Sequence, residues 1–317
     1  MQALDDPFSR YIDPDTKADF DASTTGQFEG VGMNVEEVAR GLQIVSVFKG
    51  GPAQRGGLKR GDVIVAVNGK SLKGTSSDDA TTRIKGRSGT KVKLTIVTAG
   101  KSRAETLERA KVIVPVSEKH METKDGEKIG YVTLTQFTAG AHGEVSANVR
   151  QLLKQGAKGI VFDLRHNGGG LLQEGVLTAS IFIPDGLIVS THGRNRKEER
   201  FTASGDAISP KVPVAVLVDG GTASASEIVT GALQDRHRAT VVGERTFGKG
   251  VFQEIEDLPN GGALDITVGE YFTPKGRNLG PKDGKRGLTP DVAVKDDPDT
   301  KPDEVLQRGL KVVAGEL

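Results

Sequence analysis

The chain of 317 residues contains no cysteine, no tryptophan and only five histidines. Without cysteine, disulfide scaffolds, thiolate nucleophiles and cysteine metal sites are excluded. The chain also lacks the H-E-x-x-H pattern of helical zinc sites, which argues against metal catalysis. No segment approaches the roughly 18 apolar residues that a membrane helix needs, and no signal peptide is visible.

An excess of charge of either sign is missing as well. The 43 lysines and arginines against 42 aspartates and glutamates leave a net charge of +1. This balance argues against nucleic acid as the main partner, because binding to phosphates needs a basic surface. The remaining composition is ordinary for a soluble globular protein, and the length suffices for two or three domains.

One predicted strand-to-helix corner presents a hydroxyl group among small residues. Pro213–Asp219 is a short apolar run typical of a buried strand, and Ile228–Leu233 fits a helix. Ser224 therefore lies at a helix N-terminus, where an attacking hydroxyl and amide donors for an oxyanion can share one small volume. Ser224 and Glu227 also form the S-x-x-E pattern of a capping box, so the local sequence leaves both interpretations open.

A glycine-flanked lysine, Lys249, follows that corner in the chain. Most lysines are solvated surface charges, and one acts as a base only where burial or nearby positive charge favours its neutral form. The segment Gly243–Lys249 also spells the start of a phosphate-binding loop, G-x-x-x-x-G-K. Nucleotide binding is disfavoured, because Gly250 replaces the required hydroxyl residue and Val251–Glu256 alternates like a strand where a helix is needed.

A second strand-to-helix corner contains a glycine triplet. Gly159–Arg165 is predicted as a buried strand and Leu171–Phe182 as a helix with an apolar face. Between them, Gly168–Gly170 can turn backbone amides toward an anion, although a flexible turn is the simpler interpretation. His166 is the one histidine near this corner, and a Ser-His-Asp triad is disfavoured because no histidine has a convincing context.

The rest of the chain predicts a small β-rich module followed by alternating strands and helices. The module, at about residues 28–113, is expected to contain strands at Leu42–Phe48, Asp62–Val67 and Val92–Val97 and a helix at Ser76–Ile84. The core is expected to begin with a strand at Gly126–Leu134. Its later expected elements are a hairpin of Gln253–Leu258 with Ala263–Phe272 through Asn260-Gly261, a polar link at residues 296–302 and a last helix at Asp303–Ala314.

Taken together, these segments resemble the carboxyl-terminal processing (tail-specific) protease family, serine peptidases with a Ser-Lys dyad and an embedded PDZ domain. The resemblance extends over nearly the whole chain. It is carried by the motifs Leu4–Tyr11, Gly30–Gly32, Asp163–Arg165 with the glycine triplet, Ser224–Glu227, Thr246–Gly250, Thr273–Arg277 and Thr289–Asp291.

The resemblance implies catalytic or supporting roles for residues of both corners and of the segments that follow them. Ser224, not Ser226, is the expected nucleophile, Lys249 the general base, and Gln253 the residue that orients the lysine. Lys249 and Gln253 flank the start of one predicted strand at positions of the same parity, so we expect both side chains on one face. The expected oxyanion donors are the amides of Ala225 and of Gly169 or Gly170, and Asp235 is an expected supporting residue.

The β-rich module resembles a PDZ domain, which implies that it binds protein chain ends. The amides of Val31, Gly32 and Met33 are expected to bind the terminal carboxylate, and Ala80 and Ile84 to line an apolar pocket. The expected partners are protein or peptide substrates, bound through their C-terminal tails, with an adaptor or a second copy of the chain left open. No cofactor, metal or nucleic acid is expected.

The expected fold is an α/β (α+β) core similar to crotonase and Clp protease, with an inserted PDZ domain and an N-terminal helical arm. The expected domains are residues 1–27 (arm), 28–113 (PDZ) and 114–317 (core with the C-terminal helix). Met1–Asp6 resembles the middle of a helix, which predicts that an export signal or anchor has been removed, and the family implies an extracytoplasmic location.

Two functions of other classes remain open. One is a PDZ scaffold that has lost catalysis, and the other is a crotonase-like acyl-CoA enzyme.

Overall fold

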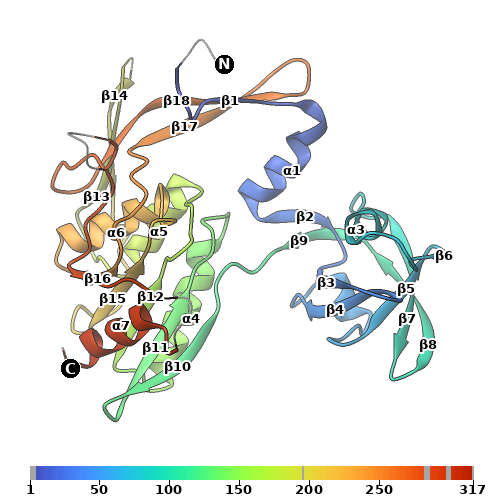
Figure 1. The fold of residues 1–317 in the computed structure, drawn as a ribbon. Coiled ribbons are helices and arrows are strands. Elements are labelled where there is room, and N and C mark those ends of the chain that lie inside the picture. Colours follow the sequence, from blue (N-terminus) through green and yellow to red (C-terminus); the bar gives the residue numbers. More distant parts are fainter. Residues whose placement is uncertain (1–4, 195, 282–285, 298–300, 316–317) are drawn as a thin grey trace. The chain divides into compact units, whose positions relative to one another are not determined.

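The computed structural model describes residues 5–194, 196–281, 286–297 and 301–315. The chain divides into two compact units, one from Thr25 to Pro115 and the other formed by the residues up to Thr24 together with those from Val116 onward (Figure 1). The smaller unit is therefore an insertion between the N-terminal segment and the rest of the larger unit.

The smaller unit contains a sheet with the strand order β3-β4-β5-β7-β8, in which β6 pairs with β5, and a separate pair of β2 and β9. Its elements are β2 (Gln27–Gly30), β3 (Met33–Val38), β4 (Gly41–Val47), α2 (Pro52–Arg55), β5 (Val63–Val67), β6 (Lys70–Ser71), α3 (Ser77–Ile84), β7 (Lys91–Thr98), β8 (Lys101–Glu108) and β9 (Ala110–Ile113). Ser76 caps α3 by accepting the Asp79 amide at 3.2 Å, as its position before the helix predicts.

The larger unit is built on a six-stranded sheet with the order β10-β11-β12-β15-β16-β19. All neighbours in it are parallel except β10 and β11. The elements of this layer are β10 (Lys119–Lys124), β11 (Glu127–Thr133), α4 (Ala141–Lys154), β12 (Gly159–Asp163), α5 (Leu172–Ser180), β15 (Val214–Val218), α6 (Ala225–Asp235), β16 (Thr240–Gly243), β19 (Val292–Ala293) and α7 (Glu304–Gly315).

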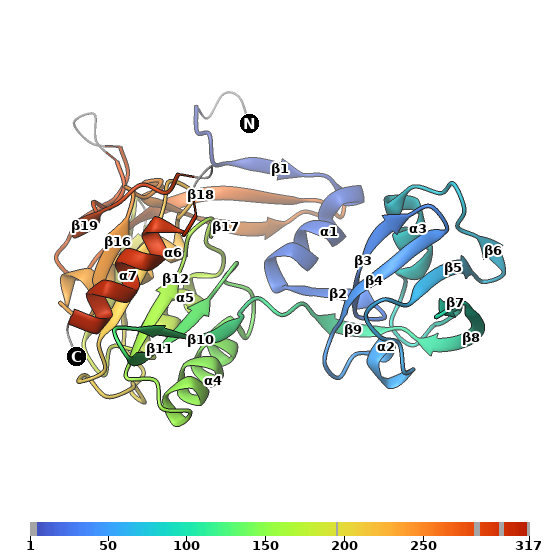
Figure 2. The same ribbon diagram turned by 60° about the horizontal axis from the view of Figure 1, so that its bottom comes forward.

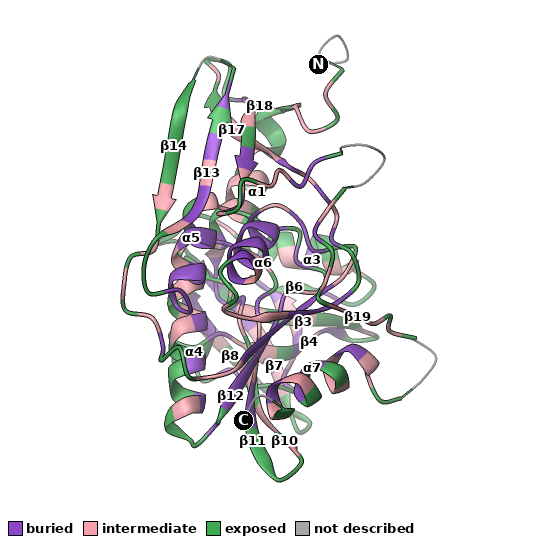
Figure 3. Ribbon diagram, turned by 90° about the vertical axis from the view of Figure 1, so that its left-hand side faces the viewer, coloured by how far each residue is buried: buried purple, intermediate pink, exposed green. Residues whose placement is uncertain are grey.

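Helices cover both faces of this sheet (Figure 2). On one face α7 packs Val305, Leu310 and Val313 onto the strands, and on the other α4, α5 and α6 enclose the main hydrophobic core. The central strands β12 and β15 are buried along their whole length (Figure 3). Continuous apolar runs are what strands covered on both faces require, which explains why the sequence predicted these two strands correctly.

A second, antiparallel sheet lies in the same unit and has the order β1-β18-β13-β14, with β17 paired to β18. Its strands are β1 (Arg10–Ile12), β13 (Leu187–Gly193), β14 (Arg196–Thr202), β17 (Val251–Asp257) and β18 (Ala263–Phe272), and the helix α1 (Pro14–Thr25) follows β1. The predicted hairpin of residues 253–258 with 263–272 is confirmed by the pairing of β17 with β18.

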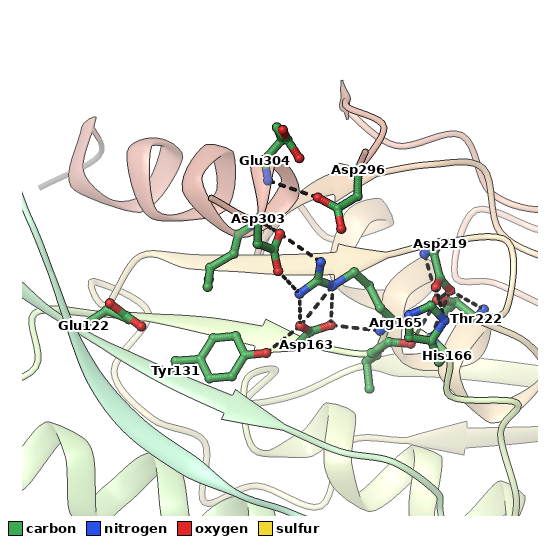
Figure 4. A network of polar contacts seen from close by, with 12 residues as sticks. Glu122, Tyr131, Asp163, Arg165, His166, Asp219, Thr222, Asp296, Asp303 and Glu304 are labelled. Atoms are coloured by element: carbon green, nitrogen blue, oxygen red, sulfur yellow. Dashed lines mark hydrogen bonds and ion pairs between the residues drawn. The ribbon is translucent and has the colours of Figure 1, made fainter. Parts of the chain in front are cut away.

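The first turn of α7 is tied to the sheet by Arg165 (Figure 4). Its guanidinium donates to Asp163 at 2.7 Å and to Asp303 at 2.8 Å, and the Tyr131 hydroxyl donates to Asp163 at 2.7 Å. Burial disfavours the charged form of Arg165, but the hydrogen bonds with Asp163 and Asp303 outweigh it and raise its pKa. This network fixes the chain just before the glycine triplet.

Two expectations about the larger unit are wrong. The first strand of the core is β10 and not the strand at Gly126–Leu134, because β10 is a polar edge strand with no apolar run to reveal it. Asp5 and Asp6 are not helical, while residues 1–4 of that expected helix lie outside the described residues. Residues 298–300 of the expected polar link are outside them as well.

Candidate active site

Ser224 occupies a strained turn between β15 and α6. Its backbone has φ +56° and ψ −118°, a region that a non-glycine residue adopts only when its surroundings enforce it. Among the described residues its hydroxyl makes no capping hydrogen bond with α6. A sharp strand-to-helix turn of this kind is one of the ways in which proteins expose a serine hydroxyl.

The neighbouring Ser226 is in a different environment. It is fully buried, and its hydroxyl donates to the carbonyl of Asn167 at 2.9 Å. The same carbonyl accepts the Ala223 amide at 3.0 Å, so Asn167 joins the glycine triplet to the serine turn. Burial therefore separates the two serines that spacing alone could not, because Ser226 has no access to a substrate.

Glu227 is the centre of the hydrogen bonds that hold the two corners together, a function that its assignment to a capping box did not reveal. It is fully buried, and its Oε2 accepts the amides of Ser224 at 3.0 Å and Lys249 at 3.1 Å. Oε2 also accepts the Tyr271 hydroxyl at 3.2 Å. Its Oε1 accepts the Gly248 amide at 2.8 Å and the Thr246 hydroxyl at 2.5 Å. One carboxylate thus positions the backbone of both proposed catalytic residues.

Lys249 is half-buried beside Ser224 in the same pocket. Burial lowers the pKa of its amine; Asp265 opposes this shift and the positive charge of Arg10 adds to it. The Nζ atom lies 5.4 Å from the centroid of the Phe8 ring. Within the described chain it makes no hydrogen bond with Ser224, so the pair is not engaged in this conformation.

Gln253 lines the pocket but does not contact Lys249. Its side-chain amide donates to the Thr267 hydroxyl at 3.0 Å. Lys249 precedes β17, which begins at Val251, so the expectation that Lys249 and Gln253 share a strand face stays a prediction, and both residues line the same cavity.

A cavity of about 590 Å³ connects these residues. The catalytic candidates that line it are Ser224, Ala225, Lys249, Gln253 and Gly170, and its other lining residues include Arg10, Phe20, Thr24, Gly168, Leu171, Leu172, Arg196, Ile228, Phe252, Asp265 and Tyr271. Its lining combines apolar side chains with charged groups of both signs, and a concave surface that carries convergent polar groups is typical of a ligand site.

Of the two glycines named as oxyanion donors, Gly169 has an amide that is already bonded. It donates to Asn167 Oδ1 at 2.9 Å, and Gly169 itself is buried. Gly170 is exposed and lines the cavity. The Gly169 carbonyl and the Leu171 amide on either side of it bond to Phe137, whereas the Gly170 amide donates to no acceptor among the described residues. The Ala225 amide, in the first turn of α6, has no intrahelical acceptor.

His166 lies outside the cavity. Its Nδ1 contacts Asp219 at 2.6 Å, and 88% of its side chain is exposed. The part of the chain that the structure describes contains no cluster of three or more potential metal ligands. No described helix is long and apolar enough to cross a membrane.

Asp235 acts at the far end of α6 from Ser224. It accepts the Lys275 amide at 2.9 Å and the Arg277 guanidinium at 2.5 Å. These bonds fix the loop after β18, and Asp235 therefore supports the framework instead of lining the cavity with Ser224.

In the smaller unit, the expected carboxylate-binding loop connects β2 to β3. The amides of Val31 and Gly32 donate to no acceptor in the described chain, while their carbonyls accept Ala53 and Phe48. Ala80 and Ile84 are 0% and 4% exposed and belong to the hydrophobic core of this unit. In this conformation they are too buried to line an open pocket.

Comparisons with known proteins identify the family of each part of the chain. The model of Peptidase family S41 matches residues 128–294, and that of the PDZ domain matches residues 20–97. The chain is 40% identical over 299 residues to a carboxyl-terminal-processing protease of Synechocystis sp. (strain ATCC 27184 / PCC 6803 / Kazusa), covering 93% of this chain and 69% of that protein. It is 37% identical over 293 residues to the carboxy-terminal processing protease CtpA of Bacillus subtilis (strain 168), covering 92% and 61%.

A solved structure gives the same result for the fold. The photosystem II D1 C-terminal processing protease matches 98% of this chain and 82% of its own, with a TM-score of 0.58 and 33% identity. The S41 match covers more than half of the chain. The chain therefore belongs to peptidase family S41 and is a serine-type peptidase with a PDZ domain.

Proposed function

We propose that this chain is an endopeptidase that cleaves proteins at or near their C-terminal tails, with Ser224 as nucleophile and Lys249 as general base. The observation that carries the proposal is that both side chains line one cavity, where burial lowers the pKa of Lys249. A lysine can act as a base only when its neutral form is accessible, and burial in this site shifts the pKa of Lys249 in that direction.

In the proposed reaction, the neutral amine of Lys249 accepts the Ser224 proton as Oγ attacks the peptide carbonyl. The oxyanion that forms is bound by the amides of Ala225 and Gly170, which lie in the same cavity. The leaving amine takes the proton back from Lys249, and water then hydrolyses the acyl-enzyme with Lys249 again as base. Gln253 orients the lysine in the engaged state, after leaving Thr267.

The PDZ domain is proposed to bind the substrate tail and to regulate access to the site. The unbonded amides of Val31 and Gly32 support this assignment, since backbone amides bind a terminal carboxylate, and Met33 is proposed as the third donor. Ala80 and Ile84 would line a side-chain pocket only after the groove opens.

We further infer that the PDZ domain spans residues 28–113 and that the protein is located outside the cytoplasm. The core is inferred to be of the crotonase and Clp type, with a helical N-terminal arm. An adaptor protein or self-association of the chain is compatible with the proposed function.

The test is hydrolysis of one tail peptide, offered with a free and with an amidated C-terminus. We expect Ser224→Ala and Lys249→Ala each to lower the rate by about 10³-fold or more, because nucleophile and base act as a unit. The control Ser226→Ala should keep a substantial part of the activity. Amidation should weaken capture about tenfold, since it removes the charge that the amides bind.

Four results would contradict the proposal in different ways. Severe loss with Ser226→Ala and little with Ser224→Ala would refute the nucleophile. Equal rates on both peptides would refute carboxylate capture. Tail binding without cleavage would indicate a silent scaffold, and hydrolysis of acyl-CoA without peptide cleavage would indicate the crotonase-like alternative.

A further inference from the structure

The N-terminal segment of the chain is part of the cavity that contains Ser224. Arg10, Phe20 and Thr24 line it, although they come from β1 and α1, far away in sequence. The segment is held there by β1, which pairs with β18 through Arg10 and Asp265. Their side chains also form an ion pair at 3.2 Å.

A tight turn just before β1 places Phe8 next to the general base. The Phe8 amide donates to Asp6 at 3.1 Å, and the Ser9 hydroxyl donates to the same carboxylate. The Ser9 hydroxyl in turn accepts the Thr267 amide of β18 at 2.9 Å. Thr267 therefore anchors the turn that carries Phe8 while its own hydroxyl accepts Gln253.

The Phe8 ring lies next to the Lys249 amine. Its centroid is 5.4 Å from Nζ, within the range in which an ammonium is attracted to a ring face. The charged groups that act on Lys249 are Asp6 and Arg10 of the N-terminal segment, Asp265 of β18 and Glu227 of α6. None of these carboxylates forms an ion pair with Lys249 within the described residues.

We propose that Phe8 is a positioning residue that holds the protonated form of Lys249 away from Ser224 and releases the neutral form to it. A ring face attracts a cation through its quadrupole and has no comparable attraction for a neutral amine. Loss of the proton therefore removes the contact at the moment when the amine becomes able to act as a base. This inference rests on the proposed role of Lys249.

The ring must also stabilise the charged form of Lys249 against the effect of burial. Removing the ring face while keeping the apolar volume should therefore favour the neutral amine at lower pH. Phe8→Leu makes this change, and Phe8→Tyr keeps a ring at the same position. Phe247→Leu is the matched control, because its ring faces Arg286 at 5.0 Å from the same loop that carries Lys249.

The experiment is the pH dependence of kcat/KM for a tail peptide. In Phe8→Leu the acidic limb should move to lower pH by about 0.4–1 unit, which corresponds to the usual strength of such a contact. The limb should stay in place in Phe8→Tyr and in Phe247→Leu. An unmoved limb in Phe8→Leu, or one displaced to higher pH, would overturn the proposal.

A second measurement needs neither activity nor a Phe8 variant. The sample is Ser224→Ala protein whose lysines carry ¹³C-methyl groups, and the Lys249 NMR signal is assigned by its absence in Lys249→Arg. At low pH the Phe8 ring should shift the chemical shift of this signal. That ring-current shift should decrease as the amine loses its proton. A signal without such a shift would overturn the role of Phe8, whereas absence of hydrolysis by the unaltered protein would refute only the proposed function.

Discussion

Glu227→Gln is the substitution that most directly tests how the site is held together. The side chains have the same shape, but an amide nitrogen replaces one of the two acceptor oxygens. Oε1 accepts two donors and Oε2 accepts three, so either orientation places an NH₂ group against at least two donors. No rotation of the side chain restores them, because Glu227 is fully buried.

The expected loss follows from these contacts. A hydrogen bond to a charged group contributes about 1.5–3 kcal/mol, so losing two should lower the free energy of unfolding by about 3–6 kcal/mol. For a unit of this size the melting temperature should fall by on the order of 10 °C. Because the Gly248 amide next to Lys249 then loses its acceptor, and the remaining oxygen, now uncharged, binds the amides of Ser224 and Lys249 more weakly, peptide hydrolysis should also fall by about 10²-fold or more at temperatures where the protein is folded.

Thermal unfolding followed by circular dichroism, together with kcat on a tail peptide, measures both effects. Glu174→Gln is the matched control, since Glu174 is buried and accepts the amides of Gly140 and His142 but lies outside the cavity. It should lose stability with little change in kcat. If Glu227→Gln retained kcat as well as the control does, the carboxylate would not be what aligns the two catalytic segments.

Two further predictions concern the same cavity. Gly169→Ala should abolish hydrolysis, because the added Cβ would lie 2.7 Å from the Ser224 Cβ and Gly169 has a φ of +102°. The control Gly220→Ala should stay active, because a Cβ there has nothing within 4 Å. Equal activity of the two variants would contradict the packing argument. Activity should rise with pH to a plateau with a midpoint below the ordinary lysine pKa, because burial lowers the pKa of Lys249 and its neutral form is the proposed base. A midpoint at or above the ordinary value would contradict that role.

Much of the framework around the site could be predicted from the sequence, because the strands there are buried on both faces. Val214–Val218 and Gly159–Asp163 are continuous apolar runs, and each predicted element lies within a few residues of the observed one. The strand Lys119–Lys124 could not be recognised, because an edge strand buries little and its side chains are polar. Arg196–Thr202 is an exposed strand of the same kind.

The site itself was less predictable, because its geometry depends on contacts between distant segments. Serine, lysine and glutamine were assigned by resemblance, and the hydrogen bond of Gln253 with Thr267 joins two strands, which no local pattern reveals. For Glu227 the local pattern predicted one contact, with the Ser224 amide. The other donors come from residues 246–249 and from Tyr271, which are brought together only by the folded chain.

The two interpretations of the S-x-x-E pattern, helix cap or catalytic corner, are compatible at this turn. Glu227 accepts the Ser224 amide, as in a capping box, while the Ser224 hydroxyl does not cap the helix. A serine that capped α6 in the usual way would direct its oxygen to the helix amides and away from a substrate. The φ of +56° at Ser224 costs about 1–3 kcal/mol, which the hydrogen bonds of Glu227 can offset. The Glu227 carboxylate thus stabilises the turn as in a capping box. The Ser224 hydroxyl remains available for the proposed attack, and the Ala225 amide remains available for an oxyanion.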